Sequence, residues 1–165
     1  MNPISYWQRL KVAFQYVMPQ IYMTQAAGWL AKQKWGAVTH FVIKAFAKKY
    51  NIDMSIAEKE KFSDYASFNE FFIRPLKENA RPINQNPTAL CCPADGRVSE
   101  CGHIEDDRLL QAKGHFFSLN DLLAEDKDLT ETFKNGEFIT TYLSPRDYHR
   151  VHMPCDGTLR KMIYV

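Results

Sequence analysis

Two histidines lie three residues apart in the segment YLSPRDYHRVHMPCDG, which runs from Tyr142 to Gly157. His149 and His152 follow Asp147 and precede a Pro-x-Asp-Gly sequence. An imidazole titrates near neutral pH, so it can transfer protons, and in its neutral form it can bind zinc. Three interpretations therefore compete: a metal site, an acid–base site, and a polar loop without chemistry.

The spacing of the two histidines bears on the metal interpretation. Positions i and i+3 share a face on a helix, whereas an odd spacing on a strand puts side chains on opposite faces. The neighbouring sequence is strand-like and Pro154 disfavours a helix, so zinc is the weakest of the three. Histidines on opposite faces can have separate roles, and a carboxylate from a distant turn, such as Asp95, can orient one imidazole. The residues alone leave the acid–base and structural interpretations open.

The turn sequence after the histidines occurs twice. PADGRV, from Pro93 to Val98, and PCDGTL, from Pro154 to Leu159, share the pattern Pro-x-Asp-Gly-x-aliphatic. Asp-Gly favours tight turns, because glycine accepts positive φ and aspartate bonds the backbone. The repeat predicts two similar β-hairpin turns, in which Asp95 and Asp156 are first of all turn residues.

Composition indicates a folded protein. The 165 residues are 45% hydrophobic and 24% charged, which suits one domain with a core. The four cysteines form no C-x-x-C pair, and two of them, Cys91 and Cys92, are adjacent, so we expect reduced thiols and no structural zinc. No secretory signal is visible, and no apolar run approaches the roughly 20 residues that span a bilayer.

Charge is distributed unevenly. Residues 1–50 hold all three tryptophans and seven of the 21 basic residues, but none of the 19 acidic ones. Basic amphipathic helices with tryptophan and phenylalanine on one side bind anionic membrane surfaces. The alternative is that these are core helices whose lysines face water. Nucleic acid is disfavoured as a partner, because many apolar residues lie between the lysines and no nucleic-acid motif is present.

Hydrophobic periodicity predicts helices at the front of the chain. One covers residues 4–30 and is kinked or divided by Pro19, and the next covers Trp35 to Tyr50. The second has one apolar stripe, made of Trp35, Val38, Val42, Ala45 and Phe46. The S-x-x-E sequences that begin at Ser55 and Ser67 are both capping-box patterns.

The C-terminal part of the sequence predicts a β-rich region. Four prolines in residues 75–93 indicate a connector, and the boundary falls at about residues 75–90. One helix is expected after Ser118, ending before Gly136, with Leu119, Leu122, Leu123 and Phe133 facing inward. Strands are expected at 137–143 and 159–165. The predicted fold class is therefore α+β, with amphipathic helices followed by the start of a β-rich domain.

Four segments then carry a family resemblance. FNEFFIRPLKENARPI (68–83), PADGRVS (93–99), QAKGHFFSL (111–119) and YLSPRDYHRVHMPCDG (142–157) together resemble the bacterial phosphatidylserine decarboxylases. The resemblance covers nearly the whole chain, in order. It implies a peripheral enzyme at the cytoplasmic face of the inner membrane that converts phosphatidylserine to phosphatidylethanolamine and CO2 through a pyruvoyl Schiff base. The pyruvoyl group arises when the proenzyme cleaves itself at a serine.

The resemblance also implies roles for individual residues. Asp95 and His152 match the acid and base that activate the self-cleaving serine, and His149 matches the histidine that transfers a proton during decarboxylation. No metal is implied. The expected partners are phosphatidylserine, the anionic phospholipid membrane, a pyruvoyl-bearing α chain and, in a homodimer, a second copy. No nucleic acid is expected.

The chain departs from the family pattern at the serine. None of its seven serines follows a glycine, so the Gly-Ser step that yields the pyruvoyl group is absent. We therefore expect the N-terminal, β-chain portion of a proenzyme, inactive alone. In that hypothesis residues 1–74 associate with the membrane and residues 75–165 form part of the catalytic domain. The alternative is a non-catalytic protein or subunit that binds membrane surfaces.

Overall fold

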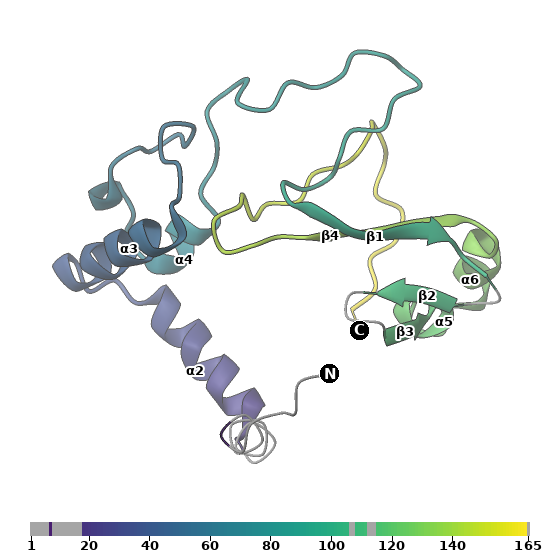
Figure 1. Cartoon of the computed structure of the whole chain (residues 1–165), viewed down its shortest axis with the longest axis horizontal. Coiled ribbons are helices and arrows are strands. Elements are labelled where there is room, and N and C mark those ends of the chain that lie inside the picture. Colours follow the sequence, from purple (N-terminus) through teal and green to yellow (C-terminus); the bar gives the residue numbers. More distant parts are fainter. Residues whose placement is uncertain (1–6, 8–17, 106–107, 112–114, 165) are drawn as a thin grey trace.

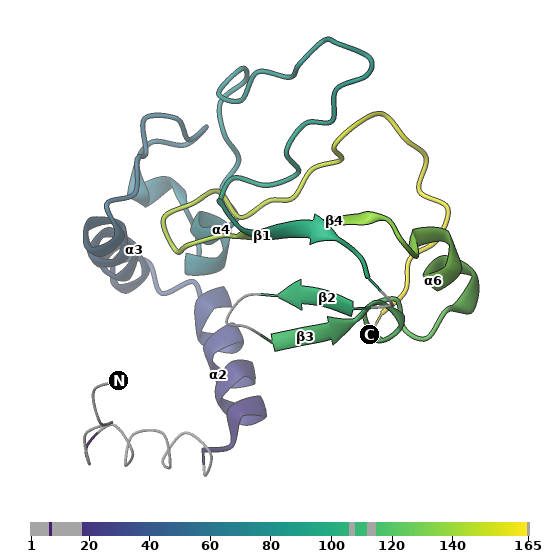
Figure 2. The same cartoon turned by 45° about the vertical axis from the view of Figure 1, so that its right-hand side comes forward.

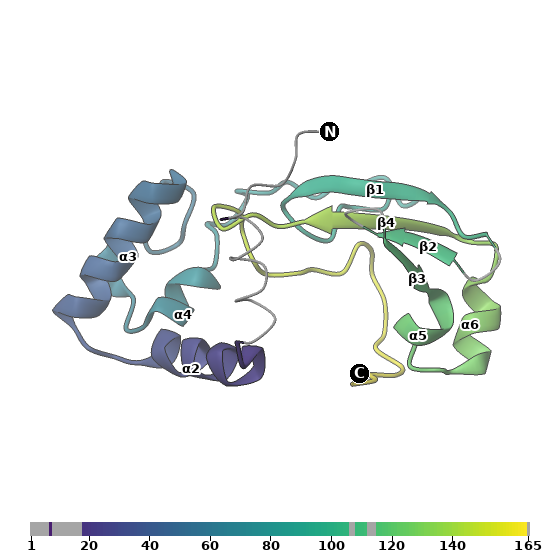
Figure 3. The ribbon, with the colours of Figure 1, turned by 60° about the horizontal axis from the view of Figure 1, so that its bottom comes forward.

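The computed structural model describes residues 7, 18–105, 108–111 and 115–164. The helices of residues 20–72 lie at one end, and the short antiparallel strands lie at the other together with the helices of residues 119–133, so the α+β class is confirmed (Figures 1 and 3). The elements in chain order are α2 (Gln20–Lys32), α3 (Ala37–Tyr50), a 3₁₀ turn η1 (Phe62–Asp64), α4 (Phe68–Phe72), β1 (Arg97–His103), β2 (Arg108–Gln111), β3 (His115–Ser118), α5 (Leu119–Leu122), α6 (Lys127–Phe133) and β4 (Glu137–Tyr142).

Pro19 sets the start of α2. The helix begins at Gln20, directly after the proline, as the predicted division at Pro19 requires. Apart from Trp7, which is exposed, the part of the predicted helix at residues 4–17 lies outside the described residues. Every apolar side chain from Ile21 to Leu30 is exposed, so α2 contributes no residue to the core.

Helix α3 has two apolar faces, where the sequence predicted one. Thr39, Ile43 and Ala47 are buried and share one face with Phe46. The other face carries most of the predicted stripe, and it is exposed: Val38, Phe41 and Val42 keep between 46% and 73% of their surface. Except for Phe46, the stripe does not pack in the core, because the neighbouring face with Thr39, Ile43 and Ala47 packs there instead.

Aromatic rings build the core at the helical end. Ile43, Ala47, Tyr65 and Phe71 form a buried cluster, and Phe46 packs against its edge. The Tyr65 and Phe71 rings meet edge to face with centroids 5.5 Å apart, a favoured arrangement for aromatic pairs. This cluster fixes the position of α4 against α3.

One of the two predicted capping boxes is formed. The Ser67 hydroxyl accepts a hydrogen bond from the Glu70 backbone N–H (3.1 Å), and the Glu70 carboxylate accepts one from the Ala66 N–H (2.9 Å). The first bond satisfies an N–H of the first turn of α4 that has no intrahelical partner, and the second reaches the residue before the N-cap, one position earlier than in a standard capping box. Ser55 begins no helix, so the same pattern there was misleading.

Strands β1 and β4 pair in antiparallel fashion, from Arg97 opposite Tyr142 to His103 opposite Glu137. The predicted strand at 137–143 is thereby confirmed. The ladder is irregular between Val98 and Glu100. Gly96 leads into it, and a Cβ there would lie 2.6 Å from the Tyr142 carbonyl oxygen, so only glycine permits this approach.

The second strand pair, β2 with β3, lies below β1 and β4 in Figure 2. The single helix predicted after Ser118 is divided into α5 and α6. Ala124 and Glu125 between them adopt positive φ, which interrupts a right-handed helix. Leu119 is buried, but Leu122 and Phe133 are about half exposed, so their predicted inward orientation is wrong.

Two further expectations are not met. Neither Pro-x-Asp-Gly sequence joins two paired strands, and among the described glycines only Gly36 has positive φ. Residues 159–164 form no strand, because no described segment offers them a ladder of backbone hydrogen bonds. The structure thus supports the α+β class without the two hairpin turns.

Candidate active site

The loop after β4 turns beside α4, which brings the histidine segment against the helical end (Figures 1 and 2). Ser144 and Asp147 shape this loop. The Ser144 N–H donates to the Asp147 carboxylate (2.6 Å), and the Asp147 N–H donates to the Ser144 carbonyl (2.9 Å). Such reciprocal bonds stabilise a tight turn, and they fix the residues from which the histidines project.

His149 is held on two sides. Its ring stacks on Phe72 with centroids 4.0 Å apart, and its Nε2 lies 3.0 Å from the Ser144 carbonyl oxygen. A carbonyl only accepts, so Nε2 carries the proton in the neutral ring and Nδ1 keeps its lone pair. Burial lowers the pKa of His149 below its ordinary value of 6.5, although the bond to Ser144 opposes this effect. His149 is therefore a neutral imidazole at pH 7 with one nitrogen available.

His152 has a different environment. Its Nε2 lies 2.7 Å from the Tyr148 hydroxyl, and the two rings stack with centroids 5.4 Å apart. The imidazole is otherwise exposed, whereas Tyr148 is 9% exposed. The buried tyrosine thus orients the imidazole, and sequence analysis did not identify it, although it lies within the histidine segment.

Backbone hydrogen bonds align the histidine segment with the segment that carries Asp95. The His152 N–H donates to the Pro93 carbonyl (2.8 Å), and the Cys91 N–H donates to the Pro154 carbonyl (2.8 Å). The two Pro-x-Asp-Gly regions therefore lie side by side, in antiparallel directions. This pairing brings together the two segments that the sequence singled out.

Asp95 binds an arginine rather than a histidine. The Arg81 Nε donates to both carboxylate oxygens of Asp95 (2.9 and 2.7 Å), and the Arg81 Nη2 donates to one of them as well. Hydrogen bonding to Asp95 raises the pKa of Arg81. No hydrogen bond joins Asp95 to His152, both of which are among the described residues. The predicted acid–base pair is thus close in the fold but not in contact.

Arg74 is the buried charge of this region. It is 2% exposed, and its Nη2 donates to the carbonyl oxygens of Arg146 (3.2 Å) and Asp147 (3.5 Å). Its guanidinium lies over the Phe71 ring at 5.4 Å. Burial lowers the pKa of Arg74, but a guanidinium stays protonated in proteins. Sequence signals existed for both arginines, because Arg74 and Arg81 each precede a proline, which favours extended backbone.

A cavity of about 150 Å³ lies between these groups. Its lining includes Arg74, Arg81 and Asp95 together with Tyr148, the partner of His152. The remaining lining residues are Asn51, Asp53, Ile56, Arg146 and Asp147. Within the described residues no group of three or more His, Cys, Asp or Glu is arranged to hold a metal ion. The cavity is therefore a charged, arginine-rich space next to the histidine segment.

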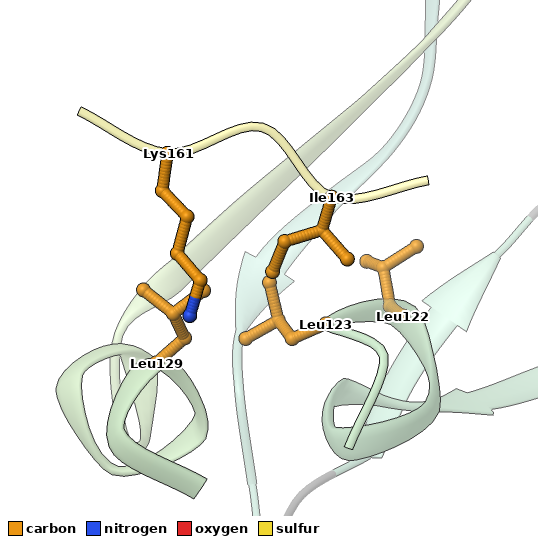
Figure 4. A pocket seen from close by; sticks show the side chains of 5 residues that line it. All are labelled: Leu122, Leu123, Leu129, Lys161 and Ile163. Carbon is orange, nitrogen blue, oxygen red and sulfur yellow. The ribbon is translucent and has the colours of Figure 1, made fainter. Parts of the chain in front are cut away.

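A larger cavity of about 270 Å³ lies elsewhere, between α5, α6 and the segment 159–164 (Figure 4). It is lined by Leu122, Leu123, Leu129, Lys161 and Ile163. The only charged group among them, Lys161, forms an ion pair with Asp126. Its lining is mostly aliphatic and includes none of the residues that the sequence singled out, whereas Asp95 and the His152 partner Tyr148 line the smaller cavity, which is therefore the candidate active site.

Comparison with known proteins identifies the family of this chain. The family model for phosphatidylserine decarboxylase matches residues 68–165, which include Asp95, His149 and His152, and a second model, described as PSD, matches residues 10–51. The chain therefore belongs to the phosphatidylserine decarboxylase family.

Individual relatives are very similar. The phosphatidylserine decarboxylase proenzyme of Haemophilus influenzae (strain ATCC 51907 / DSM 11121 / KW20 / Rd) is 88% identical over the whole chain, which covers 57% of that relative. The proenzyme of Pasteurella multocida (strain Pm70) is 78% identical over 98% of the chain, which covers 55% of it. The chain thus spans a little more than half the length of these relatives.

Proposed function

We propose that this chain is the N-terminal portion of a phosphatidylserine decarboxylase proenzyme, a carboxy-lyase that converts phosphatidylserine to phosphatidylethanolamine and CO2. One observation carries the proposal: the family match includes Asp95, His149 and His152, whose segments lie side by side next to one cavity. A separate α chain that bears the pyruvoyl group would complete the site, and phosphatidylserine would be the substrate.

The residues of this chain fit a pyruvoyl group. Such a group, when present, supplies the electron-withdrawing carbonyl that protein side chains lack. His149 supplies a ring nitrogen not engaged by Ser144, beside the apolar ring of Phe72. Because burial lowers its pKa, protonated His149 is a stronger acid than free histidine. This favours delivery of a proton to the carbon that loses CO2.

The proposal assigns self-cleavage to Asp95 and His152. In this proposal His152 accepts the hydroxyl proton of a serine that lies beyond this chain, and Asp95 stabilises the resulting imidazolium. The bond from His152 N–H to the Pro93 carbonyl keeps the two segments adjacent. Asp95 must then exchange its contact with Arg81 for one with His152. The Tyr148 hydroxyl, which orients the imidazole beforehand, must release Nε2, because the serine and Asp95 need both ring nitrogens.

The helical end is proposed to bind the membrane. The exposed faces of α2 and α3 carry Trp29 and Phe41, the segment between the two helices carries the exposed Trp35, and residues 1–50 contain several lysines but no acidic residue. No described helix combines the length and hydrophobicity needed to cross a bilayer. Residues 1–74 would therefore lie on the cytoplasmic face of the inner membrane, and residues 75–165 would belong to the catalytic domain. A homodimer is part of the same proposal.

The decisive experiment tests a completed protein. Residues 1–165 are fused to the C-terminal segment of the Haemophilus influenzae relative that this chain does not cover. We expect self-cleavage into two fragments, seen by mass spectrometry, and CO2 release from phosphatidylserine vesicles. His152→Ala should abolish cleavage, and His149→Ala should cleave normally but turn over slowly. His103→Ala, at an exposed position of β1, serves as the control.

Two outcomes would contradict the proposal. Normal cleavage in His152→Ala would refute the role of His152. A completed protein that binds vesicles but neither cleaves itself nor releases CO2 would favour the non-catalytic membrane-binding alternative. Vesicle binding by itself does not separate the two functions, because both predict it.

A further inference from the structure

Arg74 has hydrogen-bonding capacity that the described residues leave unused. Its side chain is among the largest fully buried ones, at 2% exposure. Its Nε and Nη1 are buried and have no hydrogen-bond partner within the described chain, whereas Nη2 is anchored to the carbonyls of Arg146 and Asp147. A buried charged group without partners is costly, so these donors indicate a missing acceptor.

The neighbouring carboxylates do not fill this role. Asp95 is bound by Arg81 through several hydrogen bonds. Asp147 accepts from the Ser144 N–H and lies 3.7 Å from Arg146. Asp53 is exposed and accepts from the Ser55 N–H. Arg74 is therefore the guanidinium in the lining of this cavity that lacks an ionic partner among the described residues.

The cavity and its position identify the kind of ligand. Arg74 lines a space of about 150 Å³, and a single water needs only about 10–15 Å³ of such volume, so a phosphate-sized group fits. Asn51 and Arg146 in the lining are exposed, which leaves the space accessible. The guanidinium is anchored to the residues just before Tyr148 and His149, so an anion here lies beside the histidine segment.

We propose that the Arg74 guanidinium, whose Nε and Nη1 have no partner among the described residues, binds the phosphodiester of the glycerophospholipid substrate. This inference rests on the proposed function. A planar guanidinium presents two parallel donors that match phosphate oxygens. The carboxylate of phosphatidylserine is the weaker candidate, because an ion pair to the departing group stabilises the ground state more than the transition state. The phosphodiester keeps its charge throughout, so binding it lowers KM without opposing the reaction.

Steady-state kinetics of the completed protein test the role of Arg74. Arg74→Met should raise KM for phosphatidylserine by about 10- to 100-fold, the loss expected for hydrogen bonds to a charged group, with little change in kcat. Arg74→Lys keeps the positive charge but lacks the two parallel donors of the guanidinium, and it should raise KM by less than Arg74→Met does. Arg160→Met, at an exposed position, should change KM by less than about twofold. An unchanged KM in Arg74→Met, or a fall in kcat alone, overturns the inference.

A binding measurement does not depend on activity or on the folding of a variant. The protein without substitutions is labelled with ¹⁵N-arginine. The NMR resonance of the Arg74 Nε–H group is then followed while soluble analogues of the lipid headgroup are added. Glycerophosphoserine should shift it at lower concentrations than inorganic phosphate, and serine, which lacks phosphate, should not. An equal response to serine would assign the site to the carboxylate and overturn the inference. An equal response to inorganic phosphate would show an anion site without headgroup recognition and would also overturn it.

Failure of this inference is distinguishable from failure of the proposed function. If the completed protein releases no CO2, the proposed function fails whatever Arg74 binds. If it releases CO2 and the Arg74 variants keep the wild-type KM, only the phosphodiester site fails. A probe-insensitive resonance in active protein would mean that a segment beyond this chain supplies the acceptor.

Discussion

The rings of Phe72 and His149 stack with centroids 4.0 Å apart and an angle of 22° between their planes. Phe72 is the last residue of α4, which is held in the aromatic core by its neighbour Phe71. The Arg150 side chain adds a hydrogen bond from its Nε to the Ile73 carbonyl (2.7 Å). The helical end of the molecule thus determines how far the His149 imidazole is removed from water.

Removing the Phe72 ring should therefore change the titration of His149. In Phe72→Ala water reaches the imidazole, so the cause of its lowered pKa is lost, and the pKa should rise toward 6.5. NMR titration of ¹⁵N-labelled histidine measures this shift. Phe133→Ala, at a half-exposed position on α6, is the control. An unchanged His149 pKa in Phe72→Ala would mean that other groups desolvate the ring.

Stability should also depend on pH through His149. Its pKa is lowered in the folded state, so the unfolded chain binds the proton more readily. The contribution to stability is full above about pH 6.5 and is lost as the pH falls below that value. Urea unfolding should show a steeper decline between pH 7 and 5 for wild type than for His149→Gln. Identical declines in the two proteins would contradict the assignment.

Two carboxylates titrate in a separate, more acidic range. Hydrogen bonds from Lys161 and Lys59 lower the pKa values of Asp126 and Glu70. Their contributions to stability are therefore lost only as the pH falls below about 4.5. The decline between pH 7 and 5 can thus be attributed to His149 by comparison with the variant.

Tyr148→Phe should slow self-cleavage of the completed protein. The variant loses the hydrogen bond to His152 Nε2 but keeps the ring that stacks on it. A neutral hydrogen bond contributes about 1 kcal/mol, so a reduction of roughly fivefold is expected. The rate is followed by the appearance of the two fragments on gels. Tyr142→Phe, at an exposed position of β4, should cleave at the wild-type rate.

Charge reversal on α3 should weaken membrane binding. Lys44, Lys48 and Lys49 are exposed, and each basic residue near an anionic surface contributes about 1 kcal/mol. The triple change to glutamate should reduce binding to phosphatidylglycerol vesicles by roughly 100-fold or more at low salt, and by less at high salt. Vesicle sedimentation measures this. Reversal of Lys127, Lys134 and Arg160, at the other end of the molecule, should have little effect; equal losses would contradict a membrane-binding helical end.

The two S-x-x-E sequences offer a matched pair of variants. Ser67→Ala removes the N-cap of α4 and should lower the free energy of unfolding by about 1 kcal/mol. Ser55→Ala removes no helix cap and should change it by less than about 0.5 kcal/mol. Urea unfolding distinguishes the two. Equal losses would mean that Ser67 acts through its burial rather than through its cap.

Local sequence patterns predicted some elements of this fold correctly and others not. The α2 start after Pro19, the α3 bounds, the cap at Ser67 and strand β4 all follow from short-range signals, and the structure bears them out. The two Asp-Gly sequences were predicted with the same kind of signal, but neither forms a hairpin between paired strands, and the single helix predicted after Ser118 is divided in two. Gly96 is required by a close approach to Tyr142, a contact that no local pattern reveals.

The sequence by itself determined the residue types of the site and the family to which they belong. Only the tertiary structure decided their partners: Phe72 for His149, Tyr148 for His152, and Arg81 for Asp95. Periodicity reports which residues share a face, but not which face another element covers. A helix with two apolar faces, such as α3, or a buried guanidinium without a partner, such as Arg74, therefore becomes visible only when distant segments are packed together.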